Sequence, residues 1–319
     1  MKRILAADIG GTSSRFASFS ADDAGRLRHE SSEWIRTGDV DSFDDLMERL
    51  RESPFPLDPG EADGAVIAVA GPVEGGTRSA PPNISWKIDL AQSAARAGLG
   101  KAALINDFIA QAFATLSPIA SVAEEILPGR AAEGGVVGVI GAGTGLGHAA
   151  LVPAGGGDYV AVPSEKGHAA FSLSSPREQE FQEFLRRQTG EPYPTGDTVV
   201  SGRGLRLIHH FLTGEDLSPE EVTPLLTPSS ETLLWAARFY GRACRDYVLT
   251  VLARGGLYIA GGLAVRTPEL VKSEAFAAEF RSSSKMADLL AEIPVHLISD
   301  EESGLWGAAQ YALQVLLRK

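Results

Sequence analysis

The chain has 319 residues, and 29 lysines and arginines against 41 aspartates and glutamates give it a net charge of −12 at pH 7. This acidic balance disfavours nucleic acid and anionic membranes as partners, and the single cysteine, Cys244, excludes a disulfide framework and a multi-cysteine zinc site. The apolar content of 44% is enough to bury two cores, and Asp8 interrupts the first apolar run before it reaches the length of a signal peptide, so we expect a soluble cytoplasmic protein of about two domains.

The N-terminal segment Arg3–Trp34 predicts three strands, joined by turns at Gly10–Thr12 and Ala21–Gly25. A turn with few side chains lets a ligand approach the main chain and offers amide N–H groups to an anion, so we expect phosphate at the first of these turns. Asp8 ends the strand before that turn, where a carboxylate can hold Mg²⁺ beside phosphate oxygens. A solvated loop acid is the alternative.

A helix capped by Ser42 and a strand at Ala65–Ala70 come next. In the following stretch, Val73–Trp86, two adjacent prolines argue against regular structure. Asn83 and Trp86 would give this stretch hydrogen-bonding groups beside an aromatic plane, which suits a carbohydrate. An ordinary surface loop is the alternative.

The strand Ala102–Ile105 runs into Asn106 and Asp107, and apolar residues at helical spacing follow. Asparagine and aspartate at such a junction commonly cap the helix. A general base held at the carboxyl end of a strand is the other interpretation, because α/β sheets bind ligands at that edge. Both stay open.

The second half begins with Val136–His148, a β-branched apolar strand followed by glycine at alternate positions from Gly141 to Gly147. The spacing fits neither the G-x-G-x-x-G dinucleotide fingerprint nor a P-loop, which needs a Gly-Lys-Ser/Thr ending. We interpret it as a second strand–turn–strand phosphate site, with a purely structural hairpin as the alternative.

Glu165 and His168 then lie three residues apart and suggest two hydrogen-bonding groups for one polar ligand, too few for a metal site. The remaining elements that the sequence predicts are strands at Leu151–Ala154, Tyr159–Val162, Leu257–Ala260 and Ile293–Ile298, and helices at Asp89–Ala97, Arg177–Gln188, Gly204–Leu212, Ser230–Ala253 and Gly304–Leu317.

Several segments together resemble the bacterial glucokinases in order and spacing: Asp8–Arg15, Ile105–Phe108, Gly141–Gly147, Glu165–His168, Val199–Leu205 and Leu257–Arg266. The resemblance implies an α/β chain with a two-domain ribonuclease-H-like fold, the actin-like ATPase fold, around a deep interdomain cleft. Its small domain would comprise residues 1–107 plus 300–319 and its large domain residues 108–299. The implied reaction transfers the γ-phosphoryl group of ATP to the 6-hydroxyl group of glucose, with Mg²⁺ as cofactor.

The resemblance also implies roles for individual residues. Asp107 would be the general base. The residues expected to bind the sugar are Asn83, Asn106, Asp107, Glu165, His168 and Asp197. Those expected to bind the nucleotide are Asp8, Gly10, Gly11, Thr12, Gly141, Gly143, Thr144, Gly145, Gly261 and Gly262. Asp8 would hold Mg²⁺ through water.

Three positions depart from the family pattern: Ser13 stands where asparagine is usual, Lys166 where glycine is usual, and Asp197 where a glutamate contacts the sugar. A kinase for another hexose or an amino sugar is therefore an alternative, as is a non-catalytic protein that responds to ATP or sugar. Asp8 and Asp107 favour the enzyme. The phosphoryl donor and the oligomeric state, including a homodimer, stay open. The related repressor–kinase group is disfavoured, because the chain lacks its cysteine-rich zinc motif.

Overall fold

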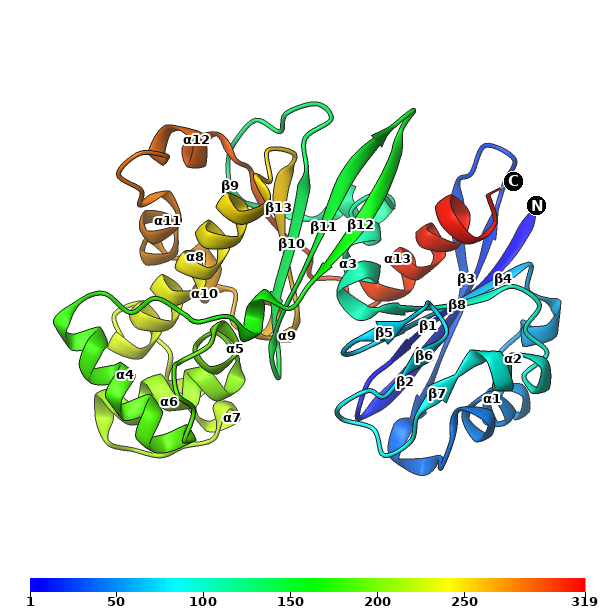
Figure 1. Ribbon diagram of the computed structural model, residues 1–319, viewed down its shortest axis with the longest axis horizontal. Helices are drawn as coiled ribbons and strands as arrows, with labels where there is room; N and C mark the ends of the chain where they lie inside the picture. Colours follow the sequence, from blue (N-terminus) through cyan, green and yellow to red (C-terminus); the bar gives the residue numbers. More distant parts are fainter. Residues whose placement is uncertain (319) are drawn as a thin grey trace. The chain divides into compact units, whose positions relative to one another are not determined.

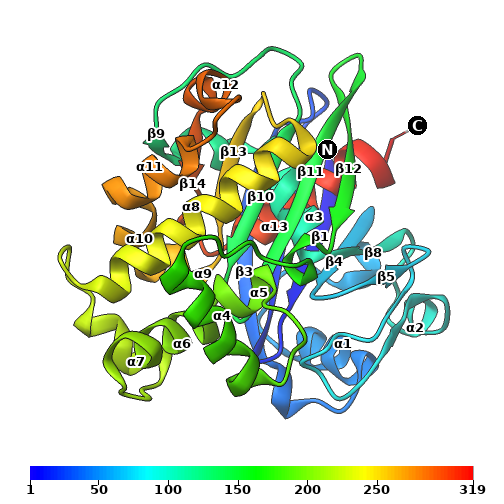
Figure 2. The same ribbon diagram turned by 60° about the vertical axis from the view of Figure 1, so that its left-hand side comes forward.

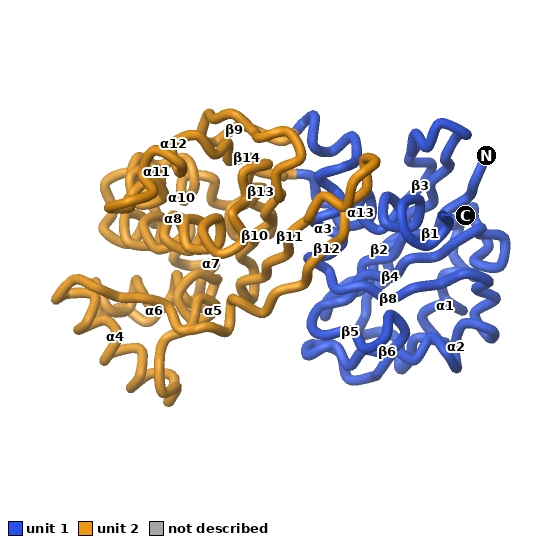
Figure 3. The backbone as a smooth tube through the Cα atoms, turned by 45° about the horizontal axis from the view of Figure 1, so that its top comes forward, with its two compact units in different colours: residues 1–122, 300–319 blue, residues 123–299 orange. Residues whose placement is uncertain are grey.

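The computed structural model describes residues 1–318, which form two compact units (Figure 3). Unit 1 contains Met1–Val122 and the C-terminal segment from Asp300, and unit 2 contains Ala123–Ser299. Each unit is a mixed α/β body built on one large sheet (Figure 1). Among residues 1–318, no helix combines the length and the apolar character that crossing a membrane requires.

The sheet of unit 1 has the strand order β3-β2-β1-β4-β8. Strands β1 to β3 form an antiparallel meander, whereas β4 runs parallel to β1 and β8 runs parallel to β4. The strands are β1 (Lys2–Ile9), β2 (Ser13–Ala21), β3 (Leu27–Arg36), β4 (Gly64–Val69) and β8 (Ala102–Asn106). The predicted meander and the two predicted strands that follow it are confirmed.

The alternation of side chains along β1 decides where Asp8 lies. Leu5, Ala7 and Ile9 point into the core that contains α1 (Phe43–Glu52), whose predicted cap is confirmed because Ser42 accepts a hydrogen bond from the Asp45 N–H. Asp8 therefore lies on the other face of the sheet, which carries α3 (Asp107–Ala114) and α13 (Ser303–Tyr311). Helix α2 (Leu90–Arg96) lies between β4 and β8 in the sequence.

Helix α3 belongs to unit 1, so the chain divides at residues 122–123 rather than after Asp107. The reason is its close packing on α13. A side chain at Gly307 would overlap the backbone of Ala110, and the rings of Phe113 and Tyr311 meet edge to face with centroids 5.1 Å apart. Beyond α13 the chain continues in one π-helical turn, Ala312–Leu316.

The stretch Val73–Trp86 is irregular over Ala80–Trp86, as its prolines predict, but the prediction is wrong for Val73–Ser79, where two short strands form. It contains two strands of a small antiparallel sheet formed by β5 (Val73–Glu74), β6 (Arg78–Ser79) and β7 (Ile88–Asp89). Strands of two residues need few ladder bonds, so they fit on either side of the prolines. Trp86 is 8% exposed, and its Nε1 donates to the Val40 carbonyl at 3.2 Å. It belongs to the core of unit 1 and offers no aromatic plane to a sugar.

The sheet of unit 2 has the order β12-β11-β10-β13-β14-β9. Strands β10 to β12 again form an antiparallel meander, and β13 runs parallel to β10. The strands are β9 (Glu124–Leu127), β10 (Val137–Ala142), β11 (Leu146–Gly155), β12 (Asp158–Ser164), β13 (Gly256–Ala260) and β14 (Val295–Leu297). The predicted strand at Leu151–Ala154 is the second half of β11.

Nine α-helices accompany this sheet within the described residues, and the longest, α8, packs against α6, α10 and α11 and contacts β10 (Figures 1 and 2). They are α4 (Pro176–Thr189), α5 (Gly196–Val199), α6 (Gly202–Thr213), α7 (Pro219–Val222), α8 (Glu231–Val251), α9 (Gly262–Arg266), α10 (Glu269–Lys272), α11 (Glu274–Arg281) and α12 (Ala287–Glu292). The sequence predicts α4, α6 and α8, but it does not predict α11 or the five helices of four to six residues, which carry too little periodicity.

Candidate functional site

The first glycine turn joins β1 to β2, and the buried residue Thr37 holds it in place. The Gly10 N–H donates to the Ser13 carbonyl at 3.1 Å, which closes the turn. The Thr37 hydroxyl donates to the Gly10 carbonyl at 2.7 Å, and the Thr37 N–H donates to the Thr12 carbonyl at 3.1 Å. Sequence analysis did not single out Thr37, which follows β3 and reaches the turn only through the register of the meander.

Asn83 lies directly against the tip of this turn. A Cβ atom at Gly11 would come within 2.8 Å of the Asn83 Cβ and 3.0 Å of its carbonyl oxygen, so only glycine fits there without displacement. Unit 1 thus brings together the predicted sugar-side residue Asn83 and the predicted phosphate turn Gly10–Thr12.

Asp8 stands beside the turn on the helix-covered face. Burial raises the pKa of its carboxyl group, and the positive charge of Arg15 partly offsets that effect. Arg15 is itself fixed, since Nη1 donates to the Glu301 carbonyl at 2.8 Å and the guanidinium lies 4.4 Å from the centroid of the Trp34 ring. A Cβ atom at Gly304 would lie 3.4 Å from Asp8 Oδ2, so the glycine leaves that oxygen less covered.

These features fit a divalent cation at Asp8. A partly desolvated carboxylate gains from a second positive charge. Among residues 1–318 no three histidine, cysteine, aspartate or glutamate side chains cluster as a complete metal site. A cation at Asp8 would therefore draw most of its ligands from phosphate and water, which is the mode that Mg²⁺ commonly takes.

Asn106 and Asp107 lie at the junction of β8 and α3, and the predicted capping role is confirmed. Asn106 Oδ1 accepts the Phe108 N–H at 2.9 Å, while Asn106 Nδ2 donates to the Gly71 carbonyl at 3.1 Å and to Asp107 Oδ1 at 2.9 Å. Asp107 Oδ1 also accepts the Phe108 N–H at 3.0 Å. These bonds fix the orientation of the Asp107 carboxylate at the carboxyl end of β8, and capping does not preclude a catalytic role.

The second glycine turn joins β10 to β11 and is held by the helices that follow it in sequence. The Gly143 N–H donates to the Gly145 carbonyl at 2.8 Å, and the Gly202 N–H donates to the Gly143 carbonyl at 2.9 Å. The Leu146 N–H donates to Asp197 Oδ1 at 2.8 Å. Asp197, expected at the sugar, thus has one carboxylate oxygen on the backbone of the turn.

Glu165 and His168 lie side by side, with Glu165 Oε2 3.6 Å from His168 Nε2 and the side chains 62% and 69% exposed, so both stay accessible to a ligand. Between them Gly167 is buried, and a Cβ atom there would overlap the Leu146 carbonyl oxygen. The Glu165–His168 segment therefore packs directly on the second glycine turn. Sequence analysis did not single out Leu146, because nothing in its residue type indicates this contact.

Gly261 brings the end of β13 against the end of β10. It has φ +91°, and a Cβ atom would lie 2.7 Å from the Ala142 carbonyl oxygen, so both conformation and space require glycine. Gly262 begins α9. Because β13 runs parallel to β10, this glycine pair lies at the same sheet edge as Gly141–Gly145.

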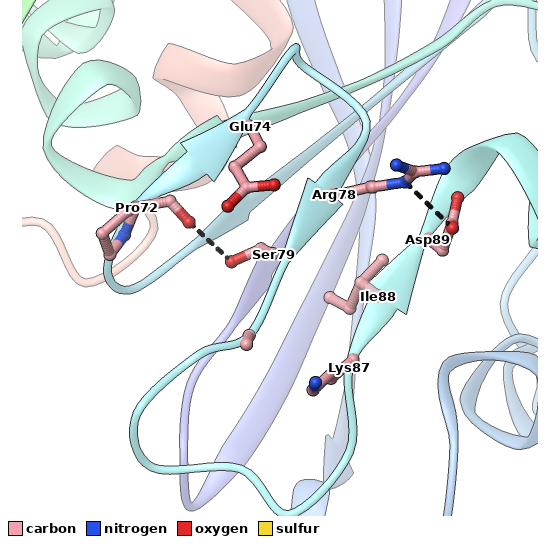
Figure 4. A pocket seen from close by; sticks show the side chains of 8 residues that line it. Pro72, Glu74, Arg78, Ser79, Lys87, Ile88 and Asp89 are labelled. Atoms are coloured by element: carbon pink, nitrogen blue, oxygen red, sulfur yellow. Dashed lines mark hydrogen bonds and ion pairs between the residues drawn. The ribbon is translucent and has the colours of Figure 1, made fainter.

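A hollow of about 420 Å³ lies beside the small sheet of unit 1 (Figure 4). Its lining includes Glu74 and Lys87, and Arg78 Nε lies 3.1 Å from Asp89 Oδ2. None of the site residues predicted from the sequence lines this part of the described structure. The hollow is thus separate from the glycine turns.

Comparison with known proteins shows which family the chain resembles over nearly its whole length. The glucokinase family model matches residues 5–315. A glucokinase from Nitrobacter hamburgensis is 32% identical over 320 residues, covering 96% of both chains. A crystal structure of a glucokinase from an Antarctic psychrotroph superposes with a TM-score of 0.83 at 28% identity, covering 97% of this chain and 98% of that one. A ROK family glucokinase from Streptomyces griseus, in complex with glucose and AMPPNP, shares the fold at a TM-score of 0.61 and 17% identity over 96% of this chain and 98% of its own.

Proposed function

The chain belongs to the glucokinase family, and on that premise we propose that it transfers the γ-phosphoryl group of ATP to the 6-hydroxyl group of D-glucose. The observation that carries this proposal is the Asp107 carboxylate, oriented by hydrogen bonds from Asn106 Nδ2 and the Phe108 N–H. An alcohol loses its proton as it attacks a phosphoryl group, so a positioned carboxylate is the base that the reaction needs.

The nucleotide would bind to main-chain groups. We propose that the glycine turns Gly10–Thr12 and Gly141–Gly145 donate N–H groups to the phosphates of ATP, with Thr12 and Thr144 adding hydroxyls, and that Gly261 and Gly262 border the adenosine. The backbone contacts of Gly11 and Gly261 support this, because both positions exclude a side chain. Asp8 would hold Mg²⁺, which supplies neutralisation of phosphate charge.

The sugar would bind to the polar side chains that the sequence singles out: Asn83, Asn106, Asp107, Glu165 and His168. Hydrogen bonds from such groups fix which hydroxyl faces Asp107, and orientation of this kind lowers the barrier by removing rotational freedom before reaction. Asp107 then accepts the proton of the 6-hydroxyl group while the oxygen of that hydroxyl group attacks phosphorus. Asp197, also expected at the sugar, has one carboxylate oxygen bonded to the Leu146 N–H.

A coupled assay with ATP, Mg²⁺ and a panel of hexoses and amino sugars tests the proposal. We expect glucose to have the highest kcat/KM. A higher value for another hexose or an amino sugar would assign the chain to that substrate instead. If glucose and AMPPNP bind but no sugar is phosphorylated, the chain is a binding protein without turnover.

A further inference from the structure

Leu146 connects three parts of unit 2. Its N–H donates to Asp197 Oδ1 at 2.8 Å, and its carbonyl oxygen lies where a Cβ of Gly167 would be. Its side chain packs on α5, since a Cβ atom at Gly196 would lie 3.1 Å from Leu146 Cδ2. The backbone of one residue therefore joins the second glycine turn to the Glu165–His168 segment and to the helix that carries Asp197.

Asp197 reaches this junction from a well-anchored helix. The Thr195 side chain caps α5 by accepting the Thr198 N–H at 3.1 Å, and the Thr198 hydroxyl donates to Glu191 Oε2 at 2.7 Å. Asp197 Oδ1 occupies the space beneath Gly145, because a Cβ atom at Gly145 would overlap it. The carboxylate thus occupies the space that a side chain at Gly145 would fill, and it also accepts a hydrogen bond from the backbone next to the turn.

We propose that Asp197 is a positioning residue for the second glycine turn, holding the tip Gly143–Gly145 in the conformation that receives the phosphates of a nucleoside triphosphate. Glycine-rich backbone loses much conformational freedom when it is ordered, so a turn that is already held binds its ligand more tightly. A carboxylate suits this role, because hydrogen bonds from N–H groups to ionised acceptors are the stronger ones. The inference rests on the proposed function in one respect, that this turn binds nucleotide.

Isothermal titration with AMPPNP and Mg²⁺, in the absence of sugar, tests the inference without requiring turnover. Asp197→Ala should weaken AMPPNP binding by about 10-fold or more, the scale of one lost hydrogen bond to a charged group. Asp197→Asn keeps an acceptor oxygen at the same place and should stay within about threefold of the wild type. Asp216→Ala, an exposed aspartate of unit 2 paired with Arg206, is the matched control and should leave the affinity unchanged.

Gly145→Ala provides a second approach that does not remove the carboxylate. Its methyl group would displace Asp197 Oδ1 from the Leu146 N–H, so this variant should weaken AMPPNP binding as Asp197→Ala does. The double variant should then be no weaker than either single one, because both remove the same contact. Multiplying effects, about 100-fold in the double variant, would mean independent sites and would overturn the inference.

The remaining outcomes separate this inference from the proposed function. An Asp197→Ala protein that melts like the control yet binds AMPPNP within about threefold of the wild type overturns the inference, whatever happens to the KM for glucose. A wild-type protein that does not bind AMPPNP overturns it as well. A wild type that binds AMPPNP and responds to these variants, but does not phosphorylate glucose, upholds the inference and rejects the glucose assignment.

Discussion

Both units place a glycine turn between the first two strands of an antiparallel meander, and the first strand of each meander pairs in parallel with a later strand. The side chains opposite each other near the turns differ. In unit 1 Asp8 faces Arg15 across the ladder, whereas in unit 2 Gly141 faces Gly147. The same arrangement of strands thus presents a turn flanked by two charged side chains in unit 1, the charged turn, and a turn flanked by glycines in unit 2, the neutral turn.

The side chains that hold the two turns show the opposite pattern of charge. The charged turn of unit 1 is held by the neutral hydroxyl of Thr37, and the neutral turn of unit 2 is held by the carboxylate of Asp197. Within residues 1–318, the most deeply buried polar side chains of unit 1 are serines and threonines, beside the half-buried carboxylate of Asp8, whereas unit 2 fully buries Glu178 and Arg242. Topology thus fixes where a turn lies, while the side chain that supports the turn differs between the two units.

The largest effect should come from a carboxylate of unit 1. Asp107→Asn keeps the hydrogen bond from the Phe108 N–H but cannot accept a proton, so kcat should fall about 10²–10⁴-fold, a barrier increase of roughly 3–5 kcal/mol. The affinity for AMPPNP and the melting temperature should stay close to those of the wild type. A kcat within tenfold of the wild type in a folded variant would leave Asp107 as a helix cap only.

Asp8→Asn tests the second carboxylate of unit 1 and should lower Mg²⁺-dependent turnover by about 10²–10³-fold, as expected for removal of one preorganised electrostatic group. Because burial raises the pKa of Asp8 in the folded state, folding disfavours its charged form at neutral pH. The neutral asparagine should therefore raise the melting temperature at pH 7. A parallel loss of activity and stability would contradict this separation of roles.

Glu178 tests the charged core of unit 2. The side chain is 1% exposed, and it pairs with Arg242, whose Nη1 lies 2.9 Å from Glu178 Oε2. Burial alone would raise the pKa of this carboxyl group, but hydrogen bonds from Arg242 and from the Ser174 N–H outweigh it and lower the pKa from 4.5 to about 2. The ionised form is thus favoured by the folded state.

The stabilisation from Glu178 should accordingly be complete above pH 4.5 and disappear as the pH falls toward about 2. At 1.36 kcal/mol per pKa unit it is worth about 3 kcal/mol at neutral pH. Urea unfolding between pH 7 and pH 2 should show Glu178→Gln less stable at pH 7 and close to the wild type near pH 2. Glu180→Gln, on the same helix, is the control. An equal deficit at both pH values would indicate lost packing rather than charge.

Much of the fold and part of the candidate site could be predicted from local sequence. The strands around Gly10–Thr12 and Gly141–Gly145 have strong apolar patterns, and the capping by Asn106 follows from residue type at a strand–helix junction. The burial of Trp86 could not be predicted, because a tryptophan in a proline-rich stretch gives no local sign of whether it faces solvent or the core.

The supports of the two turns could not be predicted, because they join distant parts of the chain. Thr37 lies 27 residues from Gly10 in sequence, and Asp197 lies 51 residues from Leu146. Neither residue type marks such a contact, and only the strand register and the placement of α5 bring the partners together. The same holds for α3, which packs on α13 through the small residue Gly307.

The smallest effect should come from the neutral support of unit 1. The Thr37 hydroxyl donates to the Gly10 carbonyl at 2.7 Å and lies 2.9 Å from the Ser14 hydroxyl, and the residue is 3% exposed. Thr37→Val keeps the shape and removes the hydroxyl, so the buried Ser14 hydroxyl and the partly buried Gly10 carbonyl lose a partner, at a cost of about 1–2 kcal/mol in unfolding free energy. The Thr37 N–H still holds the Thr12 carbonyl, which limits the displacement of the turn. AMPPNP binding should therefore weaken only about threefold, less than for Asp197→Ala.

Thr37→Ser distinguishes the contribution of the Thr37 hydroxyl from that of its methyl group, because serine keeps only the hydroxyl. It keeps the hydrogen bond to Gly10 and loses one buried methyl group, so it should lower stability by about 1 kcal/mol and leave the AMPPNP affinity unchanged. Titration calorimetry and urea unfolding of the two variants measure both quantities. If Thr37→Val weakened AMPPNP binding as strongly as Asp197→Ala, a neutral hydroxyl and a carboxylate would support their turns equally, and the contrast between the two units would reduce to Asp8 alone.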